Sequence, residues 1–204
     1  MIYKDDIKDN DAFIFELDNV LYPEKDYLLQ VYYLFAQFIE YGEQIDAQGI
    51  IAFMNDVYLK EGHADIFDQT AAQFGLDQKY RVNFDLLHQN ARLPLKLLMF
   101  APVLSFMQEI HQSGKKLFLL ADGDPLKQLN KIRQMEWNGV EQYLTVYFTE
   151  EIAKGSTAAA VVEIINKHAL DAKKTMFIGL NNLNQDSALS YEIKFLTISK
   201  LLVS

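Results

Sequence analysis

The sequence has no cysteine among its 204 residues. This absence excludes disulfide bonds and thiol catalysis, and it leaves a reducing cytosol as the default environment. Long apolar runs are also absent, since no stretch reaches the roughly 20 residues that a membrane-spanning helix needs. The nearest candidate, residues 27–38, is too short and contains Gln30 and Gln37. Residues 1–10 carry acids where a secretory signal has its apolar segment, so we expect a cytoplasmic protein.

An excess of positive charge is missing as well. The chain has 19 Lys and Arg against 28 Asp and Glu, which gives a formal net charge of −9 at pH 7. The basic residues are scattered along the sequence and form no stripe. Nucleic acids and anionic membranes attract proteins through clustered positive charge, so we expect neither as a partner.

Repeats and low-complexity tracts are absent too, and nothing in the composition indicates disorder. Half of the residues are hydrophobic, so a chain of this length can bury a substantial core. These properties favour one α/β domain with a small insertion.

The order of the expected elements indicates how the chain is organised. From Pro102 onward, helical and strand patterns alternate, which is typical of parallel strands joined by crossover helices. Between about Asp26 and Leu93, apolar residues instead recur at three- and four-residue steps, which predicts four helices. In the alternating part, strands are expected at residues 116–121, 145–148, 175–179 and 194–198, and helices at 102–112, 125–135 and 156–168.

The first of the four helices carries aromatic residues on more than one face. A helix that is apolar all round is either buried in a bundle or shared with a second subunit. We favour burial, because three other helices are available to cover it. A homodimer through these helices is the alternative to a monomer. The residues concerned are Tyr27, Tyr32, Tyr33, Phe35, Phe38 and Tyr41.

The strongest functional signal lies in residues 13–23, Phe-Ile-Phe-Glu-Leu-Asp-Asn-Val-Leu-Tyr-Pro. The apolar residues predict a buried strand of a parallel sheet, and ligands bind beyond the carboxyl ends of such strands. Glu16 and Asp18 lie at that end, two residues apart. On an extended segment their side chains point to the same face and can converge on one cation or one phosphoryl group. A strand that simply exits into a polar turn is the alternative.

Three later segments complete a pattern. Residues 117–125 are an apolar run followed by Asp-Gly-Asp-Pro, residues 147–154 end in a lysine, and residues 175–186 join an apolar run to a glycine and a final aspartate. In order and spacing, the four segments resemble the motifs of the haloacid dehalogenase-like hydrolases, nucleotidase-like branch. The resemblance covers nearly the whole chain.

The resemblance implies a fold. It implies an α/β, Rossmann-like core of three layers with a parallel sheet, formed by residues 1–22 and 94–204. It also implies an inserted four-helix cap, formed by residues 23–93.

The resemblance further implies roles for individual residues. Asp18 would be the proton donor and base of a phosphoryl transfer. The catalytic positions are Glu16, Asp18 and Lys154, and the phosphate-binding positions are Ala121, Asp122, Gly123 and Lys154. The metal ligands would be Glu16, Asp18 and Asp186.

Three positions lack the residue that the family's chemistry uses. Glu16 stands in place of an aspartate nucleophile, and its extra methylene displaces the carboxylate by about 1 Å, which can cost on the order of 10²-fold in rate. Ala121 removes a hydroxyl that holds the phosphoryl group, a loss of roughly 10²- to 10³-fold. Leu180 stands in place of a metal-binding acid, although magnesium requires six oxygen ligands. Asn181 or Asn182 could donate an amide oxygen, so we expect Mg²⁺ to bind weakly or not at all.

Acidic residues would crowd this site, with Lys154 as the one cation that the resemblance places there. Such a site repels phosphate unless it takes up a cation, or unless one carboxyl raises its pKa and stays protonated. The acids concerned are Glu16, Asp18, Asp122, Asp124 and Asp186.

We therefore predict a hydrolase fold whose phosphatase chemistry is absent or vestigial. The protein would bind a small phosphorylated molecule or a protein partner in a regulatory role. The alternative is a magnesium-dependent phosphatase that acts on a small phosphorylated metabolite such as a nucleotide or sugar phosphate. In that case Glu16 is an imperfect nucleophile, Asp18 the acid and base, and Lys154 neutralises the phosphoryl group.

Overall fold

The computed structural model describes residues 4–180 and 193–203. The chain divides into two compact units, an α/β unit and a helical unit. The α/β unit comprises Met1–Glu24, Leu97–Gln128 and Met135–Ser204, and the helical unit comprises Lys25–Lys96 and Leu129–Gln134.

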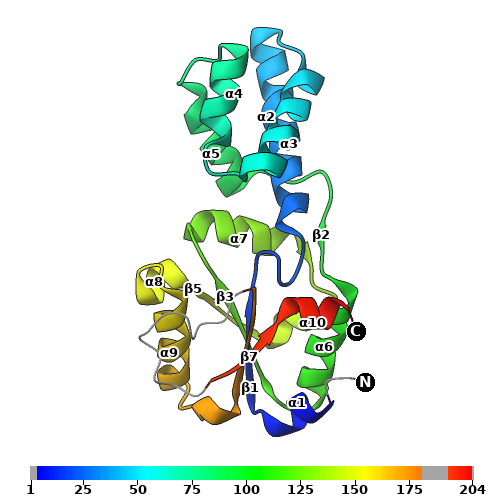
Figure 1. The fold of residues 1–204 in the computed structure, drawn as a ribbon, viewed down its shortest axis with the longest axis vertical. Helices are drawn as coiled ribbons and strands as arrows, with labels where there is room; N and C mark the ends of the chain where they lie inside the picture. The colour runs from blue at the N-terminus through cyan, green and yellow to red at the C-terminus, as the bar shows by residue number, and fades with distance from the viewer. Residues whose placement is uncertain (1–3, 181–192, 204) are drawn as a thin grey trace. The chain divides into compact units, whose positions relative to one another are not determined.

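The α/β unit is built on a five-stranded, fully parallel sheet with the strand order β5-β3-β1-β6-β7 (Figure 1). β1 is central, and the two strands that flank it are buried apart from Lys116 at the start of β3. Their near-continuous apolar sequences explain this position, because central parallel strands are covered on both faces. The strands are β1 (Ala12–Glu16), β3 (Lys116–Ala121), β5 (Leu144–Phe148), β6 (Thr175–Gly179) and β7 (Lys194–Thr197).

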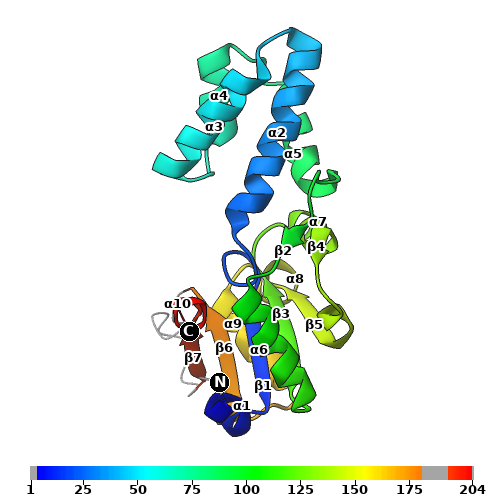
Figure 2. The same cartoon turned by 90° about the vertical axis from the view of Figure 1, so that its right-hand side faces the viewer.

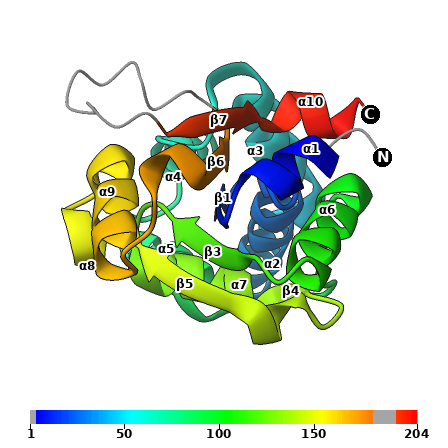
Figure 3. The same ribbon diagram turned by 90° about the horizontal axis from the view of Figure 1, so that it is seen from below.

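Helices cover both faces of this sheet, as Figures 2 and 3 show. Alternate residues of β1 point to opposite faces. Phe13 and Phe15 contact Phe106 of α6 (Ala101–Gln112) on one face, with ring centroids 5.8 and 6.1 Å apart. Ile14 joins a core with α9 (Thr157–Lys167) on the other face. The three-layer, Rossmann-like α/β architecture expected from the sequence is confirmed.

Several short elements were not predicted from the sequence. They carry few apolar residues each, so periodicity gives little signal. A two-stranded sheet pairs β2 (Leu97–Leu98) with β4 (Met135–Glu136). The others are α1 (Lys4–Asp9), η1 (Val140–Tyr143), α8 (Thr149–Ala153), η2 (Ala172–Lys174) and α10 (Ile198–Leu202). The remaining helix, α7 (Pro125–Gln134), contributes its first turn to the α/β unit and its later residues to the helical unit.

The helical unit contains the four helices that the periodicity predicted. Its core is aromatic, with Phe84 in ring contact with Phe35 and Phe67 at centroid distances of 5.1 and 5.7 Å. The buried Tyr27 hydroxyl donates a hydrogen bond to the His88 carbonyl at 2.6 Å. The helices are α2 (Glu24–Glu43), α3 (Ala47–Glu61), α4 (Ile66–Phe74) and α5 (Tyr80–Asn90).

The aromatic residues of α2 divide into a buried and an exposed set. Tyr27, Tyr32 and Phe35 are fully buried. The exposed set consists of Tyr33, Phe38 and Tyr41, which are 43%, 40% and 93% exposed. Burial in the bundle therefore accounts for half of the aromatic residues on this helix.

Within the described residues, no helix combines the length and the apolar character that crossing a membrane would require.

Candidate active site

The candidate site lies at the carboxyl edge of the sheet. Glu16 ends β1, Ala121 ends β3 and Gly179 ends β6. The register aligns these ends, because Glu16 pairs with Leu120 and Phe15 pairs with Ile178. Residues that are more than 100 positions apart in the sequence therefore meet at the edge where ligands bind in parallel sheets.

The Glu16 carboxylate is held against the end of β6. Its Oε2 accepts a hydrogen bond from the backbone N–H of Leu180 at 2.9 Å. Gly179 makes room for it, because a Cβ at that position would lie 2.6 Å from Oε2. Burial raises the pKa of Glu16, Asp122 and Asp18 raise it further, and the Leu180 hydrogen bond partly offsets these effects. A raised pKa was expected for an acid crowded by other acids, but burial contributes more to it than the charges of Asp122 and Asp18.

Asp18 lies in the loop after β1 and is held by two side chains. Its Oδ1 accepts a hydrogen bond from the Tyr22 hydroxyl at 2.7 Å. Its Oδ2 accepts one from the amide of Gln128, on α7, at 2.9 Å. Both carboxylate oxygens therefore accept hydrogen bonds from the protein, and these bonds hold the side chain at the carboxyl edge of the sheet.

The loop after β3 presents the expected phosphate-binding positions. Ala121 is fully buried, so a methyl group stands where a hydroxyl was expected to hold a phosphoryl group. Asp122 accepts a hydrogen bond at Oδ1 from the Thr149 hydroxyl at 2.6 Å, and its carbonyl accepts one from Gln128 at 2.5 Å. Gly123 has a φ of +97°, a conformation that glycine adopts without strain.

Lys154 caps the C-terminal end of α8. It has a left-handed backbone conformation with a φ of 50°, and its side chain is exposed. Within the described part of the chain, no ion pair joins Lys154 to a carboxylate. Lys154 thus lies at the end of the short helix that follows β5, and within the described residues it forms no ion pair with Glu16 or Asp18.

The metal-binding positions give a donor set that fits magnesium poorly. Leu180 offers only hydrocarbon and is 46% exposed. Oε2 of Glu16 and both carboxylate oxygens of Asp18 already accept hydrogen bonds from the protein, whereas magnesium demands near-ideal octahedral oxygen coordination. Asp186, the third expected ligand, lies outside the described residues. Among residues 4–180 and 193–203, no group of three or more His, Asp or Glu residues is placed to hold a metal ion.

Three residues that sequence reasoning did not assign hold this site together. Gln128 donates its amide to both Asp18 and the Asp122 carbonyl, Tyr22 donates to Asp18, and Thr149 donates to Asp122. The signal for Gln128 was its place in the first turn of a helix that begins directly after the second motif. The contacts with Asp18 and Asp122 depend on tertiary packing, which local sequence does not encode.

Solved structures with the same fold provide an independent comparison. A haloacid dehalogenase family hydrolase from Deinococcus radiodurans, with bound phosphate and sodium, is 12% identical, with a TM-score of 0.56 over 94% of this chain and 88% of that chain. An L-2-haloacid dehalogenase is 11% identical, with a TM-score of 0.54 over 95% and 97% of the two chains. A haloacid dehalogenase-like hydrolase from Streptococcus pneumoniae is 16% identical, with a TM-score of 0.53 over 93% and 85%.

Comparison of the sequence with family models and with curated proteins finds no match. The structural matches have low identity but cover nearly all of both chains. They establish that this protein has the fold of the haloacid dehalogenase-like hydrolases.

Proposed function

We propose that this protein is a binding or regulatory protein on a haloacid dehalogenase-like scaffold, with phosphatase chemistry that is absent or vestigial. The ligand is a small phosphorylated molecule or a protein partner, and the protein acts in the cytoplasm. The observation that carries the proposal is the engagement of the Glu16 carboxylate by Leu180.

The geometry of Glu16 supports this proposal directly. A carboxylate nucleophile must present an oxygen in line with the bond that breaks, at near-attack distance. Glu16 instead directs Oε2 to the Leu180 N–H and packs against Gly179.

The surroundings of Glu16 support it further. Ala121 supplies no hydrogen bond for charge that develops on a phosphoryl group, and donors of that kind supply much of the electrostatic stabilisation in acyl and phosphoryl transfer. The Leu180 side chain supplies no oxygen ligand. Residues that act as a unit in catalysis lose most of the rate when one is removed, so three departures together leave little activity.

The alternative is a magnesium-dependent phosphatase in which Asp18 still serves as acid and base. Two observations favour it. Asp18 is retained at the carboxyl edge of the sheet and is rigidly held, and a structural neighbour from Deinococcus radiodurans holds phosphate and sodium. In that mechanism Lys154 neutralises the phosphoryl group, and Asp186 is the remaining candidate ligand.

A phosphatase assay with p-nitrophenyl phosphate and Mg²⁺ distinguishes the two functions. The native chain is compared with Asp18→Asn and with a control, Asp56→Asn, which makes the same chemical change on the exposed face of α3. We expect no turnover above buffer from any of the three proteins. Turnover by the native chain and the control that disappears in Asp18→Asn would establish the phosphatase instead.

A further inference from the structure

A pocket lies at the edge of the sheet opposite the candidate active site, where the strands begin. It has a volume of about 380 Å³ and opens beside the first residues of β3 and β5. Strands run from this edge to the site of Glu16 and Asp18, so the pocket is separate from the candidate active site; Figure 3 views the α/β unit from this side. Its lining consists of His111, Lys115, Lys116, Leu117, Phe118, Tyr143, Thr145 and His168.

The charge of this pocket is opposite to that of the chain. Four of its lining residues are basic or can become so, and none of the lining residues in the described chain is acidic. The whole protein has a net charge of −9. Tyr143 and Thr145 add hydroxyl groups that can donate hydrogen bonds. The lining therefore combines cationic and neutral donors, which is the chemistry that binds an oxyanion.

The surroundings of His168 show which groups act on this histidine. The ring nitrogen Nε2 lies 2.8 Å from the Tyr147 hydroxyl, and the ring packs on Phe118 at a centroid distance of 4.7 Å. Burial lowers the pKa of His168, and the charges of Lys116 and Lys167 lower it further. Both of the charged groups that contribute to this shift are lysines, and among the described residues no carboxylate contributes to it.

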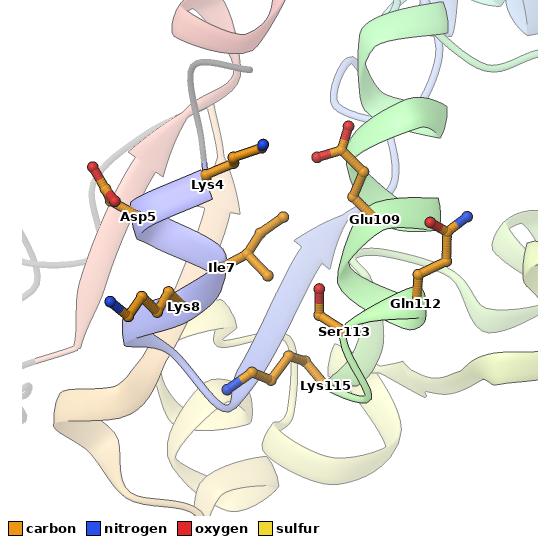
Figure 4. Close-up of a pocket in the computed structure, with 8 residues that line it drawn as sticks. All are labelled: Lys4, Asp5, Ile7, Lys8, Glu109, Gln112, Ser113 and Lys115. Carbon is orange, nitrogen blue, oxygen red and sulfur yellow. The ribbon is translucent and has the colours of Figure 1, made fainter.

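A neighbouring cavity provides a contrast. It has a volume of about 660 Å³ and lies between α1 and α6, and Lys115 lines both pockets (Figure 4). In this cavity Asp5 and Glu109 accompany the lysines, so positive and negative groups are mixed. Lys115 itself pairs with Asp11 at 2.8 Å. Lys116, which lines only the smaller pocket, is therefore the better candidate for an anion contact.

Helix position alone does not explain the basic lining. The last turn of a helix favours basic side chains, because the helix dipole is negative there. This accounts for His111 at the end of α6 and for His168 just after α9. It does not account for Lys115 and Lys116, which precede or begin a strand.

We propose that this pocket binds the phosphate group of a small anionic molecule, either free inorganic phosphate or a phosphomonoester. Lys116 and the two histidines supply the positive charge, and Tyr143 and Thr145 supply hydroxyl donors. A doubly charged phosphate stabilises the protonated histidines, since an anion within contact distance favours the charged form.

Histidine resonances in NMR spectra test this site, because the chain has only four histidines. The Cε1–Hε1 signals are followed against pH with inorganic phosphate, with AMP and with chloride at equal ionic strength. We expect phosphate or AMP to raise the pKa of His168 and to shift the His111 signal, and to leave the signals of His63 and His88 in place. Tighter binding of AMP would identify a phosphomonoester as the ligand, and equal binding would identify the phosphate group alone.

Substitutions test whether the pocket binds phosphate specifically or whether any exposed lysine attracts it. Lys116→Gln should weaken phosphate binding roughly tenfold, as expected for the loss of a charge-assisted hydrogen bond. Lys60→Gln is the control, since Lys60 is exposed on α3 and pairs with Asp56. The proposal is overturned if phosphate leaves His168 and His111 unchanged, if chloride has the same effect, or if Lys116→Gln binds as tightly as the native chain.

Discussion

The carboxylate of Glu16, at the end of β1, accepts a hydrogen bond at 2.9 Å from the backbone N–H of Leu180, which follows β6 and lies 164 residues away in sequence. The resemblance predicts a nucleophile at the first of these positions and a metal ligand at the second. In this structure the two residues are hydrogen-bonded to each other instead.

Gly179→Ala should destabilise the protein because of this contact. A Cβ at residue 179 would lie 2.6 Å from the Glu16 carboxylate and 2.8 Å from the Phe177 ring. We expect a loss of about 1–3 kcal/mol in the free energy of unfolding, which is typical of overpacking. Urea denaturation measures it. Gly42→Ala is the control, because nothing lies within 4 Å of that position in α2, and it should gain about 0.5–1 kcal/mol.

A double-mutant cycle shows whether the contact with Glu16 causes the loss of stability in Gly179→Ala. In a Glu16→Ala background, Gly179→Ala should cost less than it does in the native chain, because one of the two clashing groups is gone. An equal cost in both backgrounds would assign the whole effect to Phe177.

The stability of the protein should depend on pH through Glu16. Its pKa is raised in the folded state, so the folded chain binds more protons than the unfolded chain above the ordinary value of 4.5. The contribution of this group is therefore fully present below pH 4.5 and is lost as the pH rises through the folded pKa. Glu16→Gln cannot ionise, although its amide oxygen can still accept from Leu180.

The measurement is the free energy of unfolding of both proteins from pH 4 upward. The stability of Glu16→Gln relative to the native chain should increase as the pH rises above 4.5 and then level off. A difference that stays constant, or that decreases with pH, would show that the carboxyl is not shifted in this direction.

Gln128 should contribute to the stability of the site loops. It is 5% exposed and donates its amide to Asp18 and to the Asp122 carbonyl. Gln128→Met keeps the volume but removes both of these hydrogen bonds, which typically costs about 1–3 kcal/mol. Gln73→Met, at an exposed position of α4, should change stability by less than about 0.5 kcal/mol. Equal effects from the two substitutions in urea denaturation would argue against the bridging role.

Restoring the missing residues should restore part of the chemistry. The combined variant Glu16→Asp, Ala121→Thr and Leu180→Asp should bind Mg²⁺ more tightly than the native chain, measured by calorimetry, because it regains oxygen ligands. Some phosphatase activity is also expected. The control carries the first two substitutions only. If the triple variant binds Mg²⁺ no better than this control, Leu180 does not occupy the metal position.

Much of the fold could be predicted from the sequence. The strands Lys116–Ala121 and Thr175–Gly179 were predicted with the bounds that the structure shows, because each is a short apolar run between polar or glycine residues. The element α1 was missed, since Ile7 is its only buried residue.

The candidate site could be predicted only in part. Sequence order indicated that Glu16, Ala121 and Leu180 belong to one sheet edge, because the carboxyl ends of parallel strands meet there. The hydrogen bond from Leu180 to Glu16, and those from Gln128 to Asp18 and Asp122, depend on the packing of separate elements. The basic pocket was missed for the same reason, since its basic residues come from two segments that lie far apart in the sequence, residues 111–116 and His168.

A crystal structure of the native protein with Mg²⁺ and a phosphate mimic such as vanadate tests the central claim most directly. Our account predicts that the Glu16 carboxylate stays on the Leu180 N–H and that no octahedral Mg²⁺ forms between the ends of β1 and β6. Ordered, six-coordinate Mg²⁺ bound by Glu16 and Asp18, with the mimic beside them, would contradict it.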